Sequence, residues 1–191
     1  MITPVKVSLA LWLGWLTFWF IAARSTARTV ARQSVPARLA HLIFLWAGAA
    51  LVFGHPHQLV TWYRPIIPGD AWVPWGGVVL VVLGLGFTVW ARVHLGRFWS
   101  ASVTLKAEHA LIRSGPYALS RHPIYTGLLL ALIGTAISSG TAADAAGLGL
   151  IVLGVLLKIR QEEALLLTHF GPAYRAYRQE VPMLIPRLWG A

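Results

Sequence analysis

Residues 72–93 read WVPWGGVVLVVLGLGFTVWARV, and this stretch sets the class of protein. It carries no charged residue before Arg92. A helix of about 20 mainly apolar residues crosses the ~30 Å hydrocarbon core of a bilayer. The stretch therefore predicts a membrane-spanning helix.

Apolar runs of similar kind recur on both sides of it. The chain of 191 residues is 57% hydrophobic and only 12% charged, about half the ~25% of an average soluble domain. We predict an all-α integral membrane protein of one domain, residues 1–191. It has five transmembrane helices and then a cytoplasmic C-terminal helical segment from residue 158, with Pro172 as a break. The other four spans are expected at 5–23, 39–53, 123–139 and 142–159, so three helices lie within 1–93 and two within 94–191.

The basic residues orient these spans. The net charge is +10, and cytoplasmic loops carry an excess of Lys and Arg. All Lys and Arg residues except Lys6 and Arg64 fall in three segments, 24–38, 92–121 and 158–187. Alternation of five spans places these segments on one side. We expect an N-terminus outside and a C-terminus inside the inner membrane, with no nucleic-acid partner, because no continuous basic stripe is present.

The lack of cysteine and the positions of the ionisable residues exclude several functions, and the tryptophans agree with a membrane protein. The chain has no cysteine, which excludes disulfides, thiolate metal sites and a cysteine nucleophile, and no metal site is expected. Ionisable residues within the candidate spans, such as Asp144 and His41, lie near the span ends, which argues against a pump or channel. Tryptophans lie in or near the ends of apolar runs and fit interfacial belts: Trp12, Trp15, Trp19, Trp62, Trp72, Trp75, Trp90 and Trp99.

The sequence RHPIYTG, residues 121–127, opens the fourth span. Pro123 disfavours helix at His122 and suits the first helical position. His122 and Tyr125 would then lie at the mouth of a helix whose free N–H groups suit a carboxylate or phosphate. The alternative interpretations are a membrane anchor for Arg121, a simple cap for His122 and a belt aromatic for Tyr125.

A second polar cluster, KIRQEE at residues 158–163, ends the fifth span. Its two carboxylates, Glu162 and Glu163, are costly at a bilayer boundary unless they are paired or solvated. Lys158 and Glu162 are spaced for pairing on one helix face, so a solvated helix end is the alternative. Beyond it, Leu165, Leu166, Phe170, Tyr174 and Tyr177 form a rough apolar stripe that could lie on the membrane or fold over a site.

Six short strings follow one another along the second half of the chain: HALI at 109–112, GPY at 115–117, RHPIYTG at 121–127, EE at 162–163, FGPAY at 170–174 and VP at 181–182. Together these strings resemble the isoprenylcysteine carboxyl methyltransferase family, with a weaker likeness to phospholipid N-methyltransferases. The resemblance covers roughly residues 90–187, and the order and spacing of the strings carry it.

The resemblance implies a membrane enzyme that binds S-adenosylmethionine in a cytoplasmic pocket closed by the C-terminal segment, so that 94–191 forms the catalytic core. The family usually has an Arg about one turn before the cofactor Glu to hold the methyl acceptor. Here Lys158 occupies that position, with Arg160 nearby, and both are expected to position the acceptor. The implied cofactor contacts are His109, Ala110, Leu111, Ile112, Tyr117, His122, Pro123, Tyr125 and Glu162.

The expected substrate is a lipophilic or lipidated molecule that enters from the bilayer among membrane lipids, with an isoprenylcysteine-like carboxylate as acceptor. Trp90, Phe98 and Trp99 are candidates for the wall of its entry path. A phospholipid or small-molecule N-, O- or S-methyltransferase with the same cofactor site is the first alternative. A non-catalytic membrane scaffold or transporter component is the second.

Overall fold

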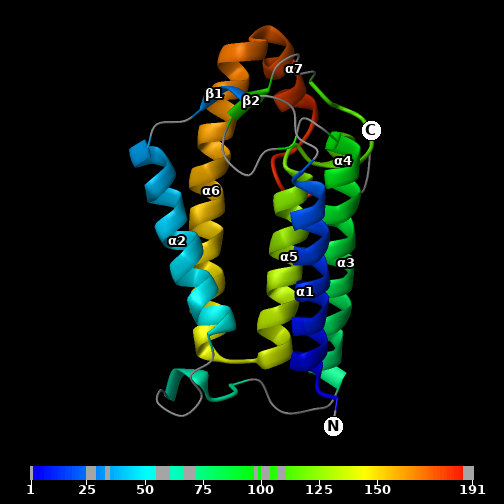
Figure 1. Cartoon of the computed structure of the whole chain (residues 1–191), viewed down its shortest axis with the longest axis vertical. Helices are drawn as coiled ribbons and strands as arrows, with labels where there is room; N and C mark the ends of the chain where they lie inside the picture. Colours follow the sequence, from blue (N-terminus) through cyan, green and yellow to red (C-terminus); the bar gives the residue numbers. More distant parts are fainter. Residues whose placement is uncertain are drawn as a thin grey trace.

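Long helices run side by side through almost the whole molecule (Figure 1). The computed structural model describes residues 2–24, 29–32, 35–54, 61–66, 72–96, 99, 104–106 and 111–186. The long helices are α1 (Pro4–Ala22), α2 (Val35–Phe53), α3 (Trp72–Leu95), α5 (Pro123–Ser139) and α6 (Ala142–Phe170). Shorter elements are α4 (Pro116–Leu119), α7 (Pro172–Glu180), the 3-10 helix η1 (Thr61–Tyr63) and the strands β1 (Thr29–Arg32) and β2 (Thr104–Lys106).

All five predicted apolar helices are present, and the prediction of an all-α integral membrane fold is confirmed. Three of them, α1, α3 and α6, are long and apolar enough to cross a membrane. The apolar parts of the other two, Arg38–Phe53 and Pro123–Ser139, are shorter, so the predicted number of five spans exceeds the three that meet this criterion. The 17 residues of α5 rise about 25 Å at 1.5 Å per residue, somewhat less than the ~30 Å of a bilayer core.

Helix α6 contains the fifth predicted span and the first part of the predicted C-terminal helical segment. The span was expected to end at Ile159, and the helix runs on without a break to Phe170. Gly171 then adopts a φ of 51°, and Pro172 is the first residue of α7, as its predicted helix break implies. The carboxylates of the 158–163 cluster therefore lie on a helix that is continuous with the fifth predicted span.

A two-stranded ribbon at one end of the bundle was not predicted. Strands β1 and β2 pair antiparallel, with Thr29 opposite Lys106. The ribbon joins the segment after α1 to the segment after α3, at the same end of the bundle as α7 (Figure 1). The three basic segments assigned to one membrane side thus meet at one end of the molecule.

Glycines let the helices approach closely, as is common in membrane bundles. A Cβ added at Gly134 of α5 would lie 2.4 Å from the carbonyl oxygen of Gly77 in α3. In the second close pair, a Cβ at Gly48 of α2 would lie 2.6 Å from the carbonyl oxygen of Gly147 in α6. The bundle therefore contains two tight pairs, α3 with α5 and α2 with α6.

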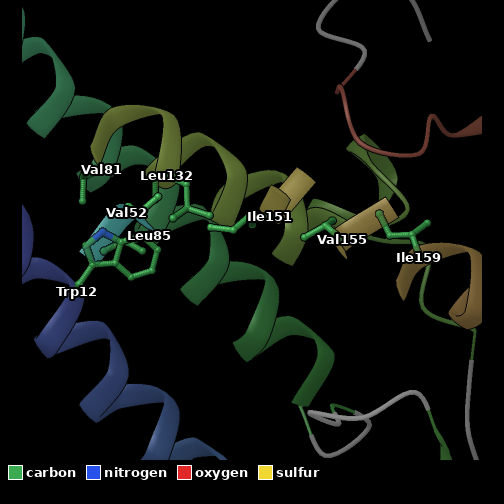
Figure 2. Packing of buried hydrophobic residues seen from close by; sticks show 9 residues of the cluster. Trp12, Val52, Val81, Leu85, Leu132, Ile151, Val155 and Ile159 are labelled. Carbon is green, nitrogen blue, oxygen red and sulfur yellow. The ribbon is translucent and has the colours of Figure 1, made fainter. Parts of the chain in front are cut away.

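Two tryptophans of α1 form hydrogen bonds to the pair of α3 and α5. The indole of Trp12 is buried and donates a 2.9 Å hydrogen bond to Thr135 of α5, while Trp15 donates a 2.6 Å bond to Thr88 of α3. Trp12 joins Val81, Leu85 and other apolar side chains in the core (Figure 2). The expectation that these two residues belong to an interfacial belt was wrong, because their N–H groups find partners inside the bundle.

Asp144, a buried carboxylate in the first turn of α6, has a structural role. Thr141 caps α6, and its side chain accepts from the backbone N–H of Asp144, whose carboxylate accepts in turn from Thr141. This reciprocal capping box explains the ionisable residue near the start of the fifth predicted span. The adjacent turn is tied to the 61–66 segment, where Ile66 N–H donates to Gly140 at 2.8 Å.

Candidate active site

The N-terminus of α5 forms the centre of the site. Pro123 is the first helical residue, as predicted, and His122 is the N-cap with φ −125° and ψ 59°. The His122 side chain does not cap the helix, since it makes no hydrogen bond to the first turn. Instead its ring turns toward α6, where it is 6% exposed.

Two residues of the 121–127 motif meet Glu162 of α6. The Tyr125 hydroxyl donates a 2.5 Å hydrogen bond to Glu162 Oε1. His122 Nδ1 lies 3.6 Å from Glu162 Oε2, and the His122 and Tyr125 rings stack with centroids 5.8 Å apart. The structure thus brings together three of the predicted site residues from distant parts of the chain.

The neighbouring Glu163 anchors the same cluster from the other side. Its Oε1 accepts from Arg121 Nε at 2.9 Å and lies 3.3 Å from His122 Nε2. Arg178 of α7 approaches Oε2 at 3.4 Å. The side chains of Arg121 and Glu163 are 9% and 10% exposed, so the guanidinium and the carboxylate compensate each other away from water.

His122 consequently sits between two carboxylates. Burial alone lowers the pKa of His122, but hydrogen bonding to Glu162 and Glu163 outweighs it and raises the pKa above the usual 6.5. The imidazole therefore holds its proton more firmly than a free histidine. A protonated ring can bridge both carboxylates, because each of its nitrogens is then a donor.

The C-terminal segment 181–186 lies across the helix mouth. The backbone N–H groups of Arg121 and His122 donate to Pro182 and Met183 at 2.9 and 3.2 Å. The hydroxyls of Ser120 and Thr126 donate to the carbonyls of Met183 and Leu184 at 2.9 and 2.6 Å. These four bonds hold the segment over the predicted site.

Tyr117 of α4, another predicted cofactor contact, packs against His94 and is bonded to Tyr177. Its ring stacks on His94 at 6.4 Å, and its carbonyl accepts a 2.6 Å hydrogen bond from the Tyr177 hydroxyl. Burial raises the pKa of Tyr117, and the charge of Glu162 raises it further. Burial likewise raises the pKa of Tyr177, to about 12. Both phenols remain neutral in the physiological range.

The remaining predicted residues fall in different places. Leu111 packs against the cluster of Tyr174, Tyr177 and Val181, and Ile112 beside it is half-buried. His109 and Ala110 lie outside the described residues.

The two predicted acceptor-positioning residues separate on α6. Lys158 Nζ lies over the ring of Tyr125, 5.4 Å from its centroid, and so belongs to the cluster. Arg160 lies on an exposed part of the helix. Since residues two apart on a helix do not face each other, only one of the two can point at the cluster.

Among the proposed entry-path residues, Trp99 is half-buried and stacks edge-on against Trp19. The Arg92 guanidinium lies 4.8 Å from the centroid of the Trp99 ring. Trp90 is 47% exposed on α3, and Phe98 lies outside the described residues. The structure therefore places Trp99 in packing between helices and Trp90 on the outer surface.

Sequence reasoning missed the structural role of Arg121 and the participation of Ser120 and Thr126. Arg121 was weighed as a membrane anchor, yet its side chain is buried against Glu163. The signal available was the pair of adjacent carboxylates, because a second buried carboxylate needs its own cation. The bonds of Ser120 and Thr126 go to backbone carbonyls of residues 183–184, which leave no sequence signature.

Comparison with known proteins relates this arrangement to one family. Residues 77–168, from α3 through the two carboxylates of α6, match the model of the isoprenylcysteine carboxyl methyltransferase family. This part of the chain, just under half of its length, is therefore similar to the isoprenylcysteine carboxyl methyltransferase family. The matched region contains the 121–127 motif, Lys158, Glu162 and Glu163, which form the cluster described above.

Relatives within and around this family carry different names. A cobalt-zinc-cadmium resistance protein, CzcN, from Cupriavidus metallidurans is 31% identical over 73% of this chain and 58% of its own length. A protein-S-isoprenylcysteine O-methyltransferase of Arabidopsis thaliana is 29% identical over 60% of each chain. The chain thus spans about three fifths of the length of these two relatives.

The fold also has a solved counterpart. A eukaryotic intramembrane Ras methyltransferase, isoprenylcysteine carboxyl methyltransferase, superposes with a TM-score of 0.56 at 24% identity. The match covers 81% of this chain and 53% of that one. It supports the isoprenylcysteine carboxyl methyltransferase fold for the helical bundle.

Proposed function

We propose that this protein is an S-adenosylmethionine-dependent methyltransferase that acts at the cytoplasmic membrane face on a lipophilic acceptor. The favoured acceptor group is the carboxylate of an isoprenylcysteine-like molecule. The observation that carries the proposal is the bond between Tyr125 and Glu162, which joins the mouth of α5 to α6 beside the buried His122. The match of residues 77–168 to the family model and the covering segment 181–186 add support.

The polar groups of the cluster suit this cofactor chemically. S-adenosylmethionine presents an ammonium and two ribose hydroxyls, which need acceptors, and a carboxylate, which needs donors. Glu162 offers a carboxylate whose side chain is 22% exposed, and the first turn of α5 has no side-chain cap, so its N–H groups suit an anion. The aromatic ring of Tyr117 suits a sulfonium cation.

In the proposed reaction the protein binds the cofactor and the methyl acceptor and aligns them. The cofactor supplies an electrophilic methyl group, which is transferred by in-line displacement. Holding an acceptor in line with such a group can lower the barrier by about 7–11 kcal/mol. A carboxylate acceptor is already ionised at neutral pH and needs no general base, whereas an amine acceptor must first lose a proton. Binding and alignment therefore suffice for a carboxylate acceptor, which we favour.

Lys158 is the residue we assign to the acceptor. Its ammonium lies over Tyr125, which itself bonds to the proposed cofactor residue Glu162. An ammonium attracts an anion as a point charge and lacks the bidentate fork of arginine. Lys158 can therefore attract other anionic lipid head groups as well as a planar carboxylate. A phospholipid or small-molecule acceptor is accordingly the second candidate.

The membrane topology follows from the charge distribution. Strands β1 and β2 and helix α7, which belong to the three basic segments, lie at one end of the bundle (Figure 1). The positive-inside rule assigns that end, and the site with it, to the cytoplasm of the inner membrane. The N-terminus then faces outward, and the acceptor reaches the site from the bilayer.

The test is transfer of a labelled methyl group from S-adenosylmethionine in lipid nanodiscs. The acceptor panel holds a farnesylcysteine analogue, a fatty acid, phosphatidylethanolamine and an alkyl thiol, each with wild type and Lys158→Gln. We expect label on the farnesylcysteine analogue, with a raised KM for the variant. Label only on the amine or thiol would overturn the favoured acceptor. Cofactor binding without transfer to any of the four would contradict the proposed acceptor classes.

A further inference from the structure

A groove runs between α1 and α3, outside the site described above. Its volume is about 800 Å³, within the ~300–1,000 Å³ usual for ligand pockets. Apolar side chains form most of its lining, from Lys6 at one end to Phe18 and Val89 at the other. The indole N–H of Trp15, which also lines it, is already bonded to Thr88.

Two glycines keep the groove open. A Cβ added at Gly14 of α1 or at Gly86 of α3 would meet nothing within 4 Å. By contrast, a Cβ at Gly84, two residues away, would lie 2.5 Å from the carbonyl oxygen of Gly127 in α5. Gly84 therefore serves helix packing, whereas Gly14 and Gly86 face open space. The apolar window of α1 is only 11% buried, against 39% for α3 and for α6.

The position of Lys6 indicates the charge of the occupant. Thr3 caps α1, so Lys6 stands in the first turn, where the helix dipole disfavours a cation. That turn contains no acidic residue. The N-terminal end of α1 lies at the opposite end of the bundle from α7 and the basic segments (Figure 1). A cation at this end of the groove suits an anionic group held beside it.

We propose that the groove binds one acyl chain of an anionic phospholipid from the leaflet opposite the candidate site, with the phosphate beside Lys6. The distance along α1 from Lys6 to Phe18 is about 18 Å at 1.5 Å per residue. This matches a chain that reaches from the head-group region past the middle of a ~30 Å hydrocarbon core. The bound chain completes the packing of α1, and the site is independent of methyl transfer.

The experiment is native mass spectrometry of the full chain in detergent with equal amounts of dioleoyl phosphatidylglycerol and phosphatidylcholine. The variants are Lys6→Gln, Gly14→Leu and Gly86→Leu. Gly149→Leu is the matched control, because Gly149 of α6 is also exposed with nothing within 4 Å of an added Cβ. Circular dichroism and size-exclusion chromatography confirm that each variant is folded.

We expect wild type and Gly149→Leu to retain one phosphatidylglycerol in preference to phosphatidylcholine. Lys6→Gln should lower that preference about fivefold, the factor expected for one Lys–phosphate attraction at a membrane surface. Gly14→Leu and Gly86→Leu should abolish retention of either lipid. Equal retention by all five proteins would overturn the proposal. So would a dimer that both leucine variants in the groove dissociate, since the occupant would then be a second copy of this chain.

Discussion

The hydroxyl of Tyr125 and the carboxylate of Glu162 are 2.5 Å apart, although the two residues are separated by 37 positions in the chain. This bond links the start of α5 to the last third of α6. It also fixes the direction of the Glu162 carboxylate beside His122. The candidate site therefore depends on how two helices meet at one end of the bundle.

The first prediction concerns that bond. In Tyr125→Phe the hydroxyl is lost while the ring remains, so Glu162 loses its donor. A hydrogen bond to a charged group is worth about 1.5–3 kcal/mol, and 1.4 kcal/mol is a factor of ten in affinity. We expect S-adenosylmethionine affinity to fall about tenfold, measured by calorimetry. Unchanged affinity would show that Glu162 is held in place without Tyr125.

The second prediction concerns the buried ion pair of Arg121 and Glu163. Arg121→Met removes the cation and leaves Glu163 with His122 and the half-exposed Arg178. Breaking such a pair costs about 3–5 kcal/mol, and we expect a clear fall in the thermal midpoint in detergent. Arg113→Met is the matched control, since the Arg113–Glu180 pair is exposed and worth at most about 1 kcal/mol. Equal shifts in the two variants would contradict a structural role for Arg121.

These elements differ in how far the sequence could predict them. The length and apolarity of the spans predicted five helices, and the 121–127 motif with Glu162 predicted a site where His122 and Tyr125 do meet that carboxylate. The predicted span ended at Ile159 because hydropathy falls at Lys158, and the helical segment predicted from residue 158 continues the same helix to Phe170. The pairing of β1 with β2 and the hydrogen bonds from residues 120–126 to the carbonyls of residues 182–184 are long-range contacts, which no local pattern encodes.

The third prediction is a pH dependence that arises from His122. Its pKa in the folded protein lies above 6.5, so its proton stabilises the fold. That contribution is fully present below pH 6.5 and is lost as pH rises through the folded pKa. The thermal midpoint of wild type should therefore fall relative to that of His122→Gln as pH rises above about 6.5. A difference between the two proteins that stays constant as pH rises would contradict a raised pKa.

The fourth prediction concerns the segment that covers the site. A chain ending at Val181 lacks the carbonyls of Pro182, Met183 and Leu184, which accept four hydrogen bonds from residues 120–126. A chain ending at Pro186 keeps them all. We expect the shorter chain to lose most of its S-adenosylmethionine affinity, and the longer one to retain it. Equal affinity in the two truncated proteins would mean that the segment does not close the site.

The most direct test of the central claim is calorimetric binding of S-adenosylmethionine to the detergent-purified protein, with Glu162→Gln and Glu180→Gln in parallel. The two substitutions make the same chemical change, but Glu180 is 59% exposed on α7, outside the cluster of His122, Tyr125 and Glu162. We predict that wild type and Glu180→Gln bind with equal affinity and that Glu162→Gln loses binding at least about tenfold, or 1.4 kcal/mol. Equal binding by all three proteins, or no binding by wild type, would contradict the assignment of this cluster as the cofactor site.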